Sequence, residues 1–286
     1  MSADLGAAEQ FMAGHARVLE RRRFARVFGG GPAEPVRDAV AAFRNEDGGF
    51  GHALEPDGRG PESQPAAVLT ALAVLDECDA WDDAIARSAC DWLATTEPEG
   101  GGTPFVLPGG EAWPHGPWWL PREGLPASLT TTGQVLGPLL RRGVEHPWVE
   151  RATAWVWSKL DDAGDADPYD VHGLVAFLEG VQDTERAAQA VDTLAPVIRG
   201  ATAPPRPGGP PDVHRAIEYA SRPDAIARRA FDDEQLQSDL DALAADQRED
   251  GGWMFSWVGW SPVAEAEWRG VVTIEALKTL RAYGRL

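Results

Sequence analysis

The sequence predicts an all-α protein built from stacked helical hairpins that close into a ring. Three observations predict this fold class. Apolar residues recur every three to four positions along most of the chain, which is the spacing of one helix face. Breaks rich in Gly and Pro separate the apolar stretches, and few segments alternate apolar and polar residues as a strand would. A motif near residue 45 returns near residue 250, which indicates an internal repeat.

Four apolar stripes mark the clearest helices in chain order. They lie within 36–43, 68–75, 171–181 and 272–283. Breaks at 29–32 and 98–110 contain too much Gly and Pro to continue a helix. With ordinary helix and connection lengths, the chain has room for about ten to twelve helices. We expect one domain over residues 1–286, with a Pro- and Gly-rich loop at 201–211.

The internal repeat is a turn between two helices. Residues 43–50 read Phe-Arg-Asn-Glu-Asp-Gly-Gly-Phe, and residues 246–253 read Asp-Gln-Arg-Glu-Asp-Gly-Gly-Trp. Each copy follows a predicted helix and leads through an aromatic, Pro-containing loop into another. Weaker relatives lie between them, at 92–140 and 156–178. Because strong copies stand near both ends and no polar repeat caps the array, we expect the last hairpin to pack on the first.

Composition and charge exclude several classes of partner. The 286 residues include 45 Asp and Glu against 26 Lys and Arg, which gives a net charge of −19 and a pI near 4.6. That charge repels a phosphate backbone or an anionic membrane surface, so we expect no nucleic acid partner. A hydrophobic content of 43% is enough for a core and excludes global disorder.

The sequence predicts a cytoplasmic protein that spans no membrane. Two cysteines, Cys78 and Cys90, are too few for a disulfide framework and lack the spacing of a metal site. Charged residues interrupt the N-terminal segment, which therefore lacks a signal-peptide core. No apolar stretch approaches the roughly 18 residues of a membrane-spanning helix. We expect no cofactor and no metal, and we leave a homodimer open.

The second copy of the repeat carries a known pattern. Its Gln247, Gly251 and Trp253 form Gln-x-x-x-Gly-x-Trp, which resembles the QW repeat of squalene–hopene cyclases and related terpene cyclases. The Asp-Gly-Gly-Phe turn of the first copy is similar to the repeats of protein prenyltransferase β subunits. These families share the α/α toroid, an inner ring of helices around a lumen and an outer ring outside it. The resemblance implies that fold and covers residues 36–75 and 239–284 at motif level, although Arg44 stands where the pattern has Gln.

The repeat motif is expected to be structural. In the families that it resembles, the Gln and Trp side chains tie one helix end to the next. Asp47 and Asp250 precede Gly-Gly turns, where a carboxylate accepts hydrogen bonds from backbone amides. We therefore expect Asp47, Asp250 and Trp253 to build turns.

The catalytic motifs of these families are missing or misplaced. Class II cyclases protonate their substrates through an Asp-x-Asp-Asp motif, which this chain lacks. Protein prenyltransferases hold zinc with Asp, Cys and His, and neither Cys78 nor Cys90 has a comparable setting. The run from Asp161 to Asp165 matches the Asp-Asp-x-x-Asp of class I terpene synthases, which bind magnesium diphosphate. Because it falls in a predicted loop and not on a helix, we interpret it as a solvated acidic loop.

Three segments have the composition of a ligand site at the mouth of a toroid. Residues 52–59 carry two carboxylates, a His and an Arg, and residues 113–119 form an aromatic loop too rich in Pro to be helical. Residues 253–260 are aromatic as well and precede Glu267-Trp-Arg269. Together with Trp268, the last two segments hold seven of the 12 tryptophans, mostly off the apolar stripes, which favours an aromatic binding wall. The expected substrate contacts are His52, Arg59, Trp113, His115, Trp118, Trp119, Trp257, Trp260, Trp268 and Arg269.

A carboxyl in an apolar setting is the best candidate for proton transfer. The expected catalytic residues are Asp57 and Glu267 and, as a second acid–base candidate at a predicted helix start, Asp170 and His172. Arg59 and Arg269 are expected to hold an anion or a paired carboxylate. The structural alternatives are a Pro-Asp-Gly turn for Asp57, an interhelix ion pair for Glu267 and a helix N-cap for Asp170.

Three functions fit these residues. The first is a terpene-cyclase- or prenyltransferase-like protein that binds an apolar isoprenoid-type ligand in an aromatic lumen and starts cyclisation with an acid. The second is a carbohydrate-active α/α-barrel enzyme, in which Asp57 and Glu267 form the carboxyl pair. The third is a noncatalytic module whose loops bind a partner or lipid. We take the first as the leading hypothesis and leave open whether the protein is an enzyme.

Overall fold

The computed structural model describes residues 3–203 and 212–286, so residues 204–211 of the predicted loop lie outside the described residues. The described residues contain twelve α-helices, three short 3-10 helices and two isolated β-bridges, which confirms the all-α prediction. The chain divides into two compact units. We call Pro32–Ala190 the central unit, and Met1–Gly31 with Val191–Leu286 the terminal unit. Within the described residues, none of the helices has both the length and the apolar composition to cross a membrane.

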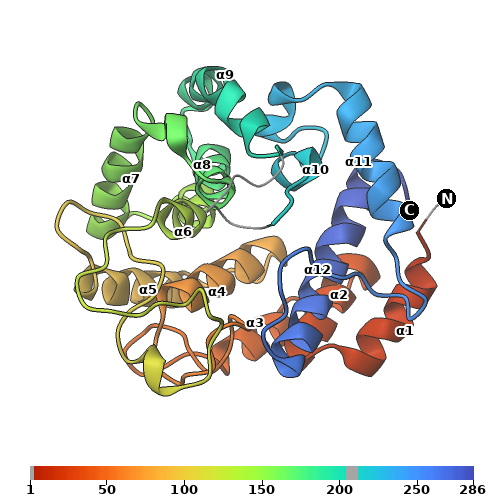
Figure 1. Ribbon diagram of the computed structural model, residues 1–286. Helices are drawn as coiled ribbons and strands as arrows, with labels where there is room; N and C mark the ends of the chain where they lie inside the picture. The colour runs from red at the N-terminus through yellow and green to blue at the C-terminus, as the bar shows by residue number, and fades with distance from the viewer. Residues whose placement is uncertain (1–2, 204–211) are drawn as a thin grey trace. The chain divides into compact units, whose positions relative to one another are not determined.

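The central unit contains six helices, drawn from orange to green in Figure 1. The predicted apolar faces are buried, since Val68, Leu72 and Leu75 have no exposed surface. Three of the helices begin with a proline, a position where its missing N–H is not needed. The six helices are α3 (Glu34–Ala41), α4 (Pro65–Glu77), α5 (Asp83–Thr95), α6 (Leu129–Arg141), α7 (Pro147–Lys159) and α8 (Pro168–Gly180).

The terminal unit joins both ends of the chain. Its last helix packs on the first two, and α9 (Thr184–Gly200) crosses the boundary between the units. Ser261 caps the last helix, because its hydroxyl accepts a hydrogen bond from the amide of Ala264 (3.1 Å). The helices are α1 (Leu5–His15), α2 (Val18–Gly29), α10 (Ala216–Tyr219), α11 (Asp233–Ala245) and α12 (Pro262–Ala282).

Helices α6 and α8 pack backbone against backbone. A Cβ at Gly133 would lie 2.1 Å from the carbonyl oxygen of Gly173, and one at Gly180 would lie 2.3 Å from that of Gly137. A Cβ at Gly173 would lie 2.3 Å from the carbonyl oxygen of Leu129. The contacts advance in the same direction along both helices, so α6 and α8 run parallel. Glycine is required here for close approach, and the two helix N-termini are brought together.

Both Asp-Gly-Gly segments form the predicted turns. The carboxylate of Asp47 accepts a hydrogen bond from the amide of Gly49 (2.9 Å), and that of Asp250 accepts one from Gly252 (3.1 Å). The glycine between them has a φ near +90° in each copy, which an L side chain would rarely adopt. The indole N–H of Trp253 donates to the carbonyl of Leu243 at the end of α11 (2.8 Å). The turn-building role of all three predicted residues is confirmed.

The N-terminal helix completes the last repeat. The Asp-Gly-Gly turn of the first repeat packs against Ser88 of α5. The Asp-Gly-Gly turn of the last repeat packs against Ala7 of α1 in the same way. The Gln247 side chain accepts from the Asp4 amide (2.7 Å) and donates to the Asp4 carbonyl (2.8 Å). Helix α1 therefore occupies, for the last turn, the position that α5 occupies for the first.

Candidate functional site

Two of the three predicted segments meet in the central unit. Gly58 and His115 form an isolated antiparallel bridge. The amide of Arg59 donates to the carbonyl of Pro114 (3.1 Å), and the amide of Gly116 donates to the carbonyl of Asp57 (2.8 Å). Residues 52–59 and 113–119 are thus joined by backbone hydrogen bonds, although about sixty residues separate them in the chain. We call this pair of segments the loop junction.

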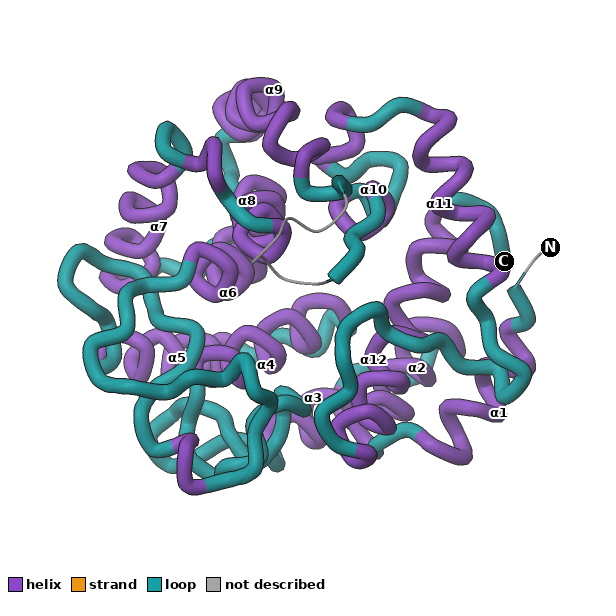
Figure 2. The backbone as a smooth tube through the Cα atoms, viewed as in Figure 1, coloured by secondary structure: helices purple, strands orange, loops and turns teal. Residues whose placement is uncertain are grey.

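The second segment belongs to a long connection between α5 and α6, drawn in teal in Figure 2. Its residues 96–128 contain one short 3-10 helix, Gly110–Ala112. The Gln64 side chain pairs with the backbone of Leu107 in both directions (2.8 and 3.4 Å), and Thr132 pairs with Thr103 (3.0 Å). A connection of this length in a compact unit is commonly functional, and here side chains of α6 and of the residue before α4 fix its course.

The first segment is strained. His52 and Ala53 have φ values of 56° and 61°, which residues other than glycine rarely adopt. The amide of His52 donates to the Gly60 carbonyl (2.9 Å), and a ring nitrogen of His52 lies 2.9 Å from the Asn45 side-chain oxygen. Each such residue costs roughly 1–3 kcal/mol, and strain of this kind gathers at ligand and active sites.

Asp57 lies at the centre of the loop junction and is only 5% exposed. The indole N–H of Trp118 donates to its carboxylate (3.1 Å). The carboxylate of Glu55 accepts from the amide of Asp57 (2.9 Å), and the Gly58 amide donates to the Glu55 carbonyl (3.3 Å). Asp57 is therefore a turn residue, as its structural alternative predicts, and at the same time a buried carboxyl that faces a tryptophan.

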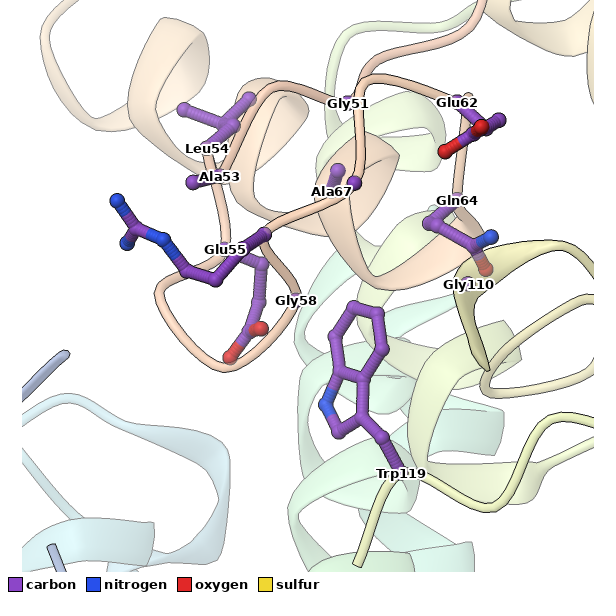
Figure 3. A pocket seen from close by; sticks show the side chains of 12 residues that line it. Gly51, Ala53, Leu54, Glu55, Gly58, Glu62, Gln64, Ala67, Gly110 and Trp119 are labelled. Atoms are coloured by element: carbon purple, nitrogen blue, oxygen red, sulfur yellow. The ribbon is translucent and has the colours of Figure 1, made fainter. Parts of the chain in front are cut away.

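Trp119 closes the junction from the other side. It is 3% exposed, its ring lies where a Cβ at Gly58 would be 2.1 Å away, and it packs edge-on against Phe105 (centroids 5.7 Å apart). Figure 3 shows the ring reaching between the Gly58 turn and Gln64, with the Glu55 side chain turned into its own loop. Its indole N–H is buried and has no hydrogen-bond partner among the described residues.

A small cavity lies beside Trp119. It is lined by residues of both loops, among them Glu55, Arg59, Glu62 and Gln64. Its volume of about 10 Å³ has room for roughly one water molecule. Trp113 covers the edge of the junction, where its indole N–H donates to Glu62 (3.0 Å). An organic ligand therefore requires the loops to move apart or binds on their outer face.

The third predicted segment belongs to the terminal unit and packs on itself. The ring of Trp257 stacks on Phe255 (4.6 Å between centroids) and meets Trp268 edge-on (5.0 Å), while Trp260 is half-buried. This segment belongs to the terminal unit and the loop junction to the central unit. A ligand contact from Trp257, Trp260 or Trp268 stays a prediction.

The charged residues of that segment are engaged in the fold. Glu267 lies 3.6 Å from the guanidinium of Arg17, the N-cap residue of α2, so the interhelix ion pair anticipated for it exists, with a partner distant in sequence. Arg269 binds the Asp250 carboxylate (2.8 Å) and the Trp253 carbonyl (3.3 Å), and its guanidinium covers the Phe11 ring. Arg269 thus pairs with a carboxylate, and that carboxylate belongs to the last repeat turn.

Asp170 connects the N-termini of α6 and α8. The N-cap of α8 is Asp167 and not Asp170, because Asp167 accepts the Asp170 amide (2.9 Å). The Asp170 carboxylate instead accepts the amide (3.2 Å) and hydroxyl (3.0 Å) of Thr130 on α6. Burial and the neighbouring Asp167 raise the pKa of Asp170, and the Thr130 bonds oppose that rise. His172 follows on α8 and is half-buried.

Asp170 predicts a pH-dependent difference in stability. Because its pKa is raised in the folded state, its stability contribution is present below the unfolded value, near 4, and is lost as pH rises through the folded pKa. Between the unfolded pKa and the folded pKa, we expect the free energy of unfolding of Asp170→Asn to increase with pH relative to that of wild type. Urea unfolding between pH 3 and 7 measures it. Asp161→Asn, in the exposed acidic loop, is the control, and a difference for Asp170→Asn that falls with pH contradicts the interpretation.

The acidic run from Asp161 to Asp165 lies in a turn and a short 3-10 helix between α7 and α8, and its carboxylates are exposed. The loop location is as predicted. Gln64 and Thr130, which position the long loop and Asp170, are absent from the residues predicted from the sequence. Neither has a local signal, since each acts on a partner about 40 residues away.

Comparison with known proteins gives a fold and no family. The chain matches no protein-family model and no curated protein sequence. It is similar to the crystal structure of a protein from Actinoplanes (TM-score 0.59, 16% identity, covering 98% of this chain and 99% of that one). It is also similar to a type II terpene cyclase from Scytonema in complex with its substrate, geranylgeranyl dihydroxybenzoate (TM-score 0.54, 12% identity, covering 98% and 86%). With the all-helical described residues, these likenesses confirm the predicted fold class, an α/α toroid.

Proposed function

We propose that this protein is a terpene-cyclase-like enzyme that binds an apolar, isoprenoid-type ligand at the loop junction and uses Asp57 as the acid that starts cyclisation. The observation that carries the proposal is the burial of Asp57 where two loops of different chain regions converge, one of which carries three tryptophans. The fold likeness to a type II terpene cyclase bound to a geranylgeranyl compound supports the ligand class.

The outer face of the junction suits an isoprenoid chain. Trp113, Trp118 and Leu120 are 42%, 37% and 64% exposed, an unusual exposure for three large apolar side chains within eight residues of one loop. Isoprene units bury their methyl groups against such rings, and a carbocation gains cation–π stabilisation there. A polar substrate would leave this apolar surface in water.

The proposed chemistry is an isomerisation. The protonated carboxyl of Asp57 gives its proton to one carbon of an alkene, or to an epoxide oxygen, and a carbocation forms on the neighbouring carbon. The π electrons of a second double bond attack that cation and close a ring. Loss of a proton from the cyclised cation forms a new double bond, so the product has the mass of the substrate and the acid is restored by one proton.

Asp57 differs from the other predicted acids because its carboxylate meets a tryptophan indole. Glu267 is paired with Arg17, and Asp170 receives two hydrogen bonds from Thr130. For carbohydrate chemistry, the predicted carboxyl pair is Asp57 and Glu267, and Glu267 is engaged in the ion pair with Arg17. The carbohydrate and noncatalytic alternatives stay predictions without a specific contact in their favour.

Product analysis tests the proposal. Squalene, oxidosqualene and geranylgeranyl diphosphate are incubated with wild type and with Asp57→Asn, and products are separated by gas chromatography and mass spectrometry. We expect a product with the mass of its substrate from wild type, and at least about 100-fold less of it from Asp57→Asn. Asp161→Asn is the matched control and should keep wild-type turnover. Equal turnover by Asp57→Asn overturns the role of Asp57, and no product or quenching of tryptophan fluorescence with any of the three substrates overturns the isoprenoid ligand.

A further inference from the structure

We propose that Trp118 is a gate over Asp57: its indole closes the carboxyl off, and the gate opens when the indole swings outward. The identity of the ligand that passes the gate rests on the proposed function, whereas the gate itself is a property of the loop junction.

One side-chain hydrogen bond joins the two residues. The indole N–H of Trp118 donates to the Asp57 carboxylate (3.1 Å), and Asp57 is 5% exposed while Trp118 is 37% exposed. The indole that donates to the buried carboxylate is therefore itself bordered by solvent. It can leave by rotation about its two side-chain torsions, without opening a void in the core.

The rest of the loop is held without Trp118. The Gly116 amide donates to the Asp57 carbonyl (2.8 Å), and the Trp119 amide donates to the Gly116 carbonyl (2.9 Å). Trp119 anchors the segment in the core, and Trp113 binds Glu62. Trp119 therefore fixes the loop, and the Trp118 side chain can turn without releasing it.

Glycine at position 116 makes room for the closed gate. A Cβ there would lie 2.8 Å from Cε2 and 3.0 Å from Cζ2 and Nε1 of the Trp118 ring. These are side-chain atoms and not backbone atoms. Gly116 itself does not have a positive φ. Gly116→Ala is therefore compatible with the backbone and pushes the indole off Asp57.

Carboxyl labelling tests the gate without any ligand. The folded protein is treated with a water-soluble carbodiimide and an amine, and the rate of modification of Asp57 is followed by peptide mass spectrometry. We expect Gly116→Ala to raise that rate by up to about tenfold, which is what the loss of one hydrogen bond is worth. Trp118→Phe, which keeps a ring and loses the N–H, should also raise it. Exposed Glu99 serves as the internal reference, and Gly164→Ala, at a glycine with open space around it, is the matched control.

The outcomes separate the gate from the proposed chemistry. Faster labelling of Asp57 in both variants, with unchanged circular dichroism, supports the gate even if no isoprenoid is turned over. Wild-type labelling rates in both folded variants overturn it, whether or not Asp57→Asn abolishes turnover. If Gly116→Ala fails to fold, Trp118→Phe alone decides.

Discussion

Gly173→Ala is expected to destabilise the protein by about 3 kcal/mol, although alanine is the better helix former. The added Cβ would lie 2.3 Å from the carbonyl oxygen of Leu129 and 2.8 Å from the Thr130 Cα, both backbone atoms of α6. Side-chain rotation relieves neither contact, so α6 and α8 must move apart and lose packing along their length. Urea unfolding followed by circular dichroism measures the loss.

Gly14→Ala is the matched control, because Gly14 lies in α1 and an added Cβ there would have no neighbouring atom within 4 Å. There the same substitution should stabilise by roughly 0.5–1 kcal/mol. The opposite signs separate helix propensity from helix contact. A Gly173→Ala protein as stable as wild type would contradict the parallel backbone contact.

Local patterns predicted much of the fold. The Asp-Gly-Gly turns were predictable because the carboxylate, the two glycines and the amide that they bind lie within three residues. The apolar stripes were predictable because helix periodicity is local too. Glycines at 133, 137, 173 and 180 are read in a sequence as weak points of a helix, and only the paired helix shows them to be contact points.

The loop junction was predictable in composition and not in pairing. Asp57 and the tryptophans of 113–119 carry the signal of a site, and the structure does bring them together. Which indole meets the carboxyl depends on hydrogen bonds between segments about sixty residues apart, and no periodicity encodes them. For the same reason the partner of Glu267 was missed, since Arg17 stands at the other end of the chain.

Trp119→Ala is expected to cost about 3–5 kcal/mol of unfolding free energy, because it removes a ring that is 3% exposed and leaves a cavity under both loops. Trp119→Phe should cost about 1 kcal/mol or less. It keeps a ring against Phe105 and removes the buried indole N–H that has no acceptor among the described residues, an orphan group worth roughly 1–3 kcal/mol.

Trp113→Ala is the control for loss of an indole from the same loop. Because 42% of the Trp113 surface is exposed, this substitution should lower the unfolding free energy by only about 1 kcal/mol. Chemical unfolding of the three variants measures the order. Equal losses for Trp119→Ala and Trp119→Phe would show that the indole N–H is satisfied in solution. Once Trp119 is removed, the segment that carries Trp118 is no longer fixed. The carbodiimide should therefore modify Asp57 faster in Trp119→Ala. In Trp119→Phe the rate should stay near that of wild type.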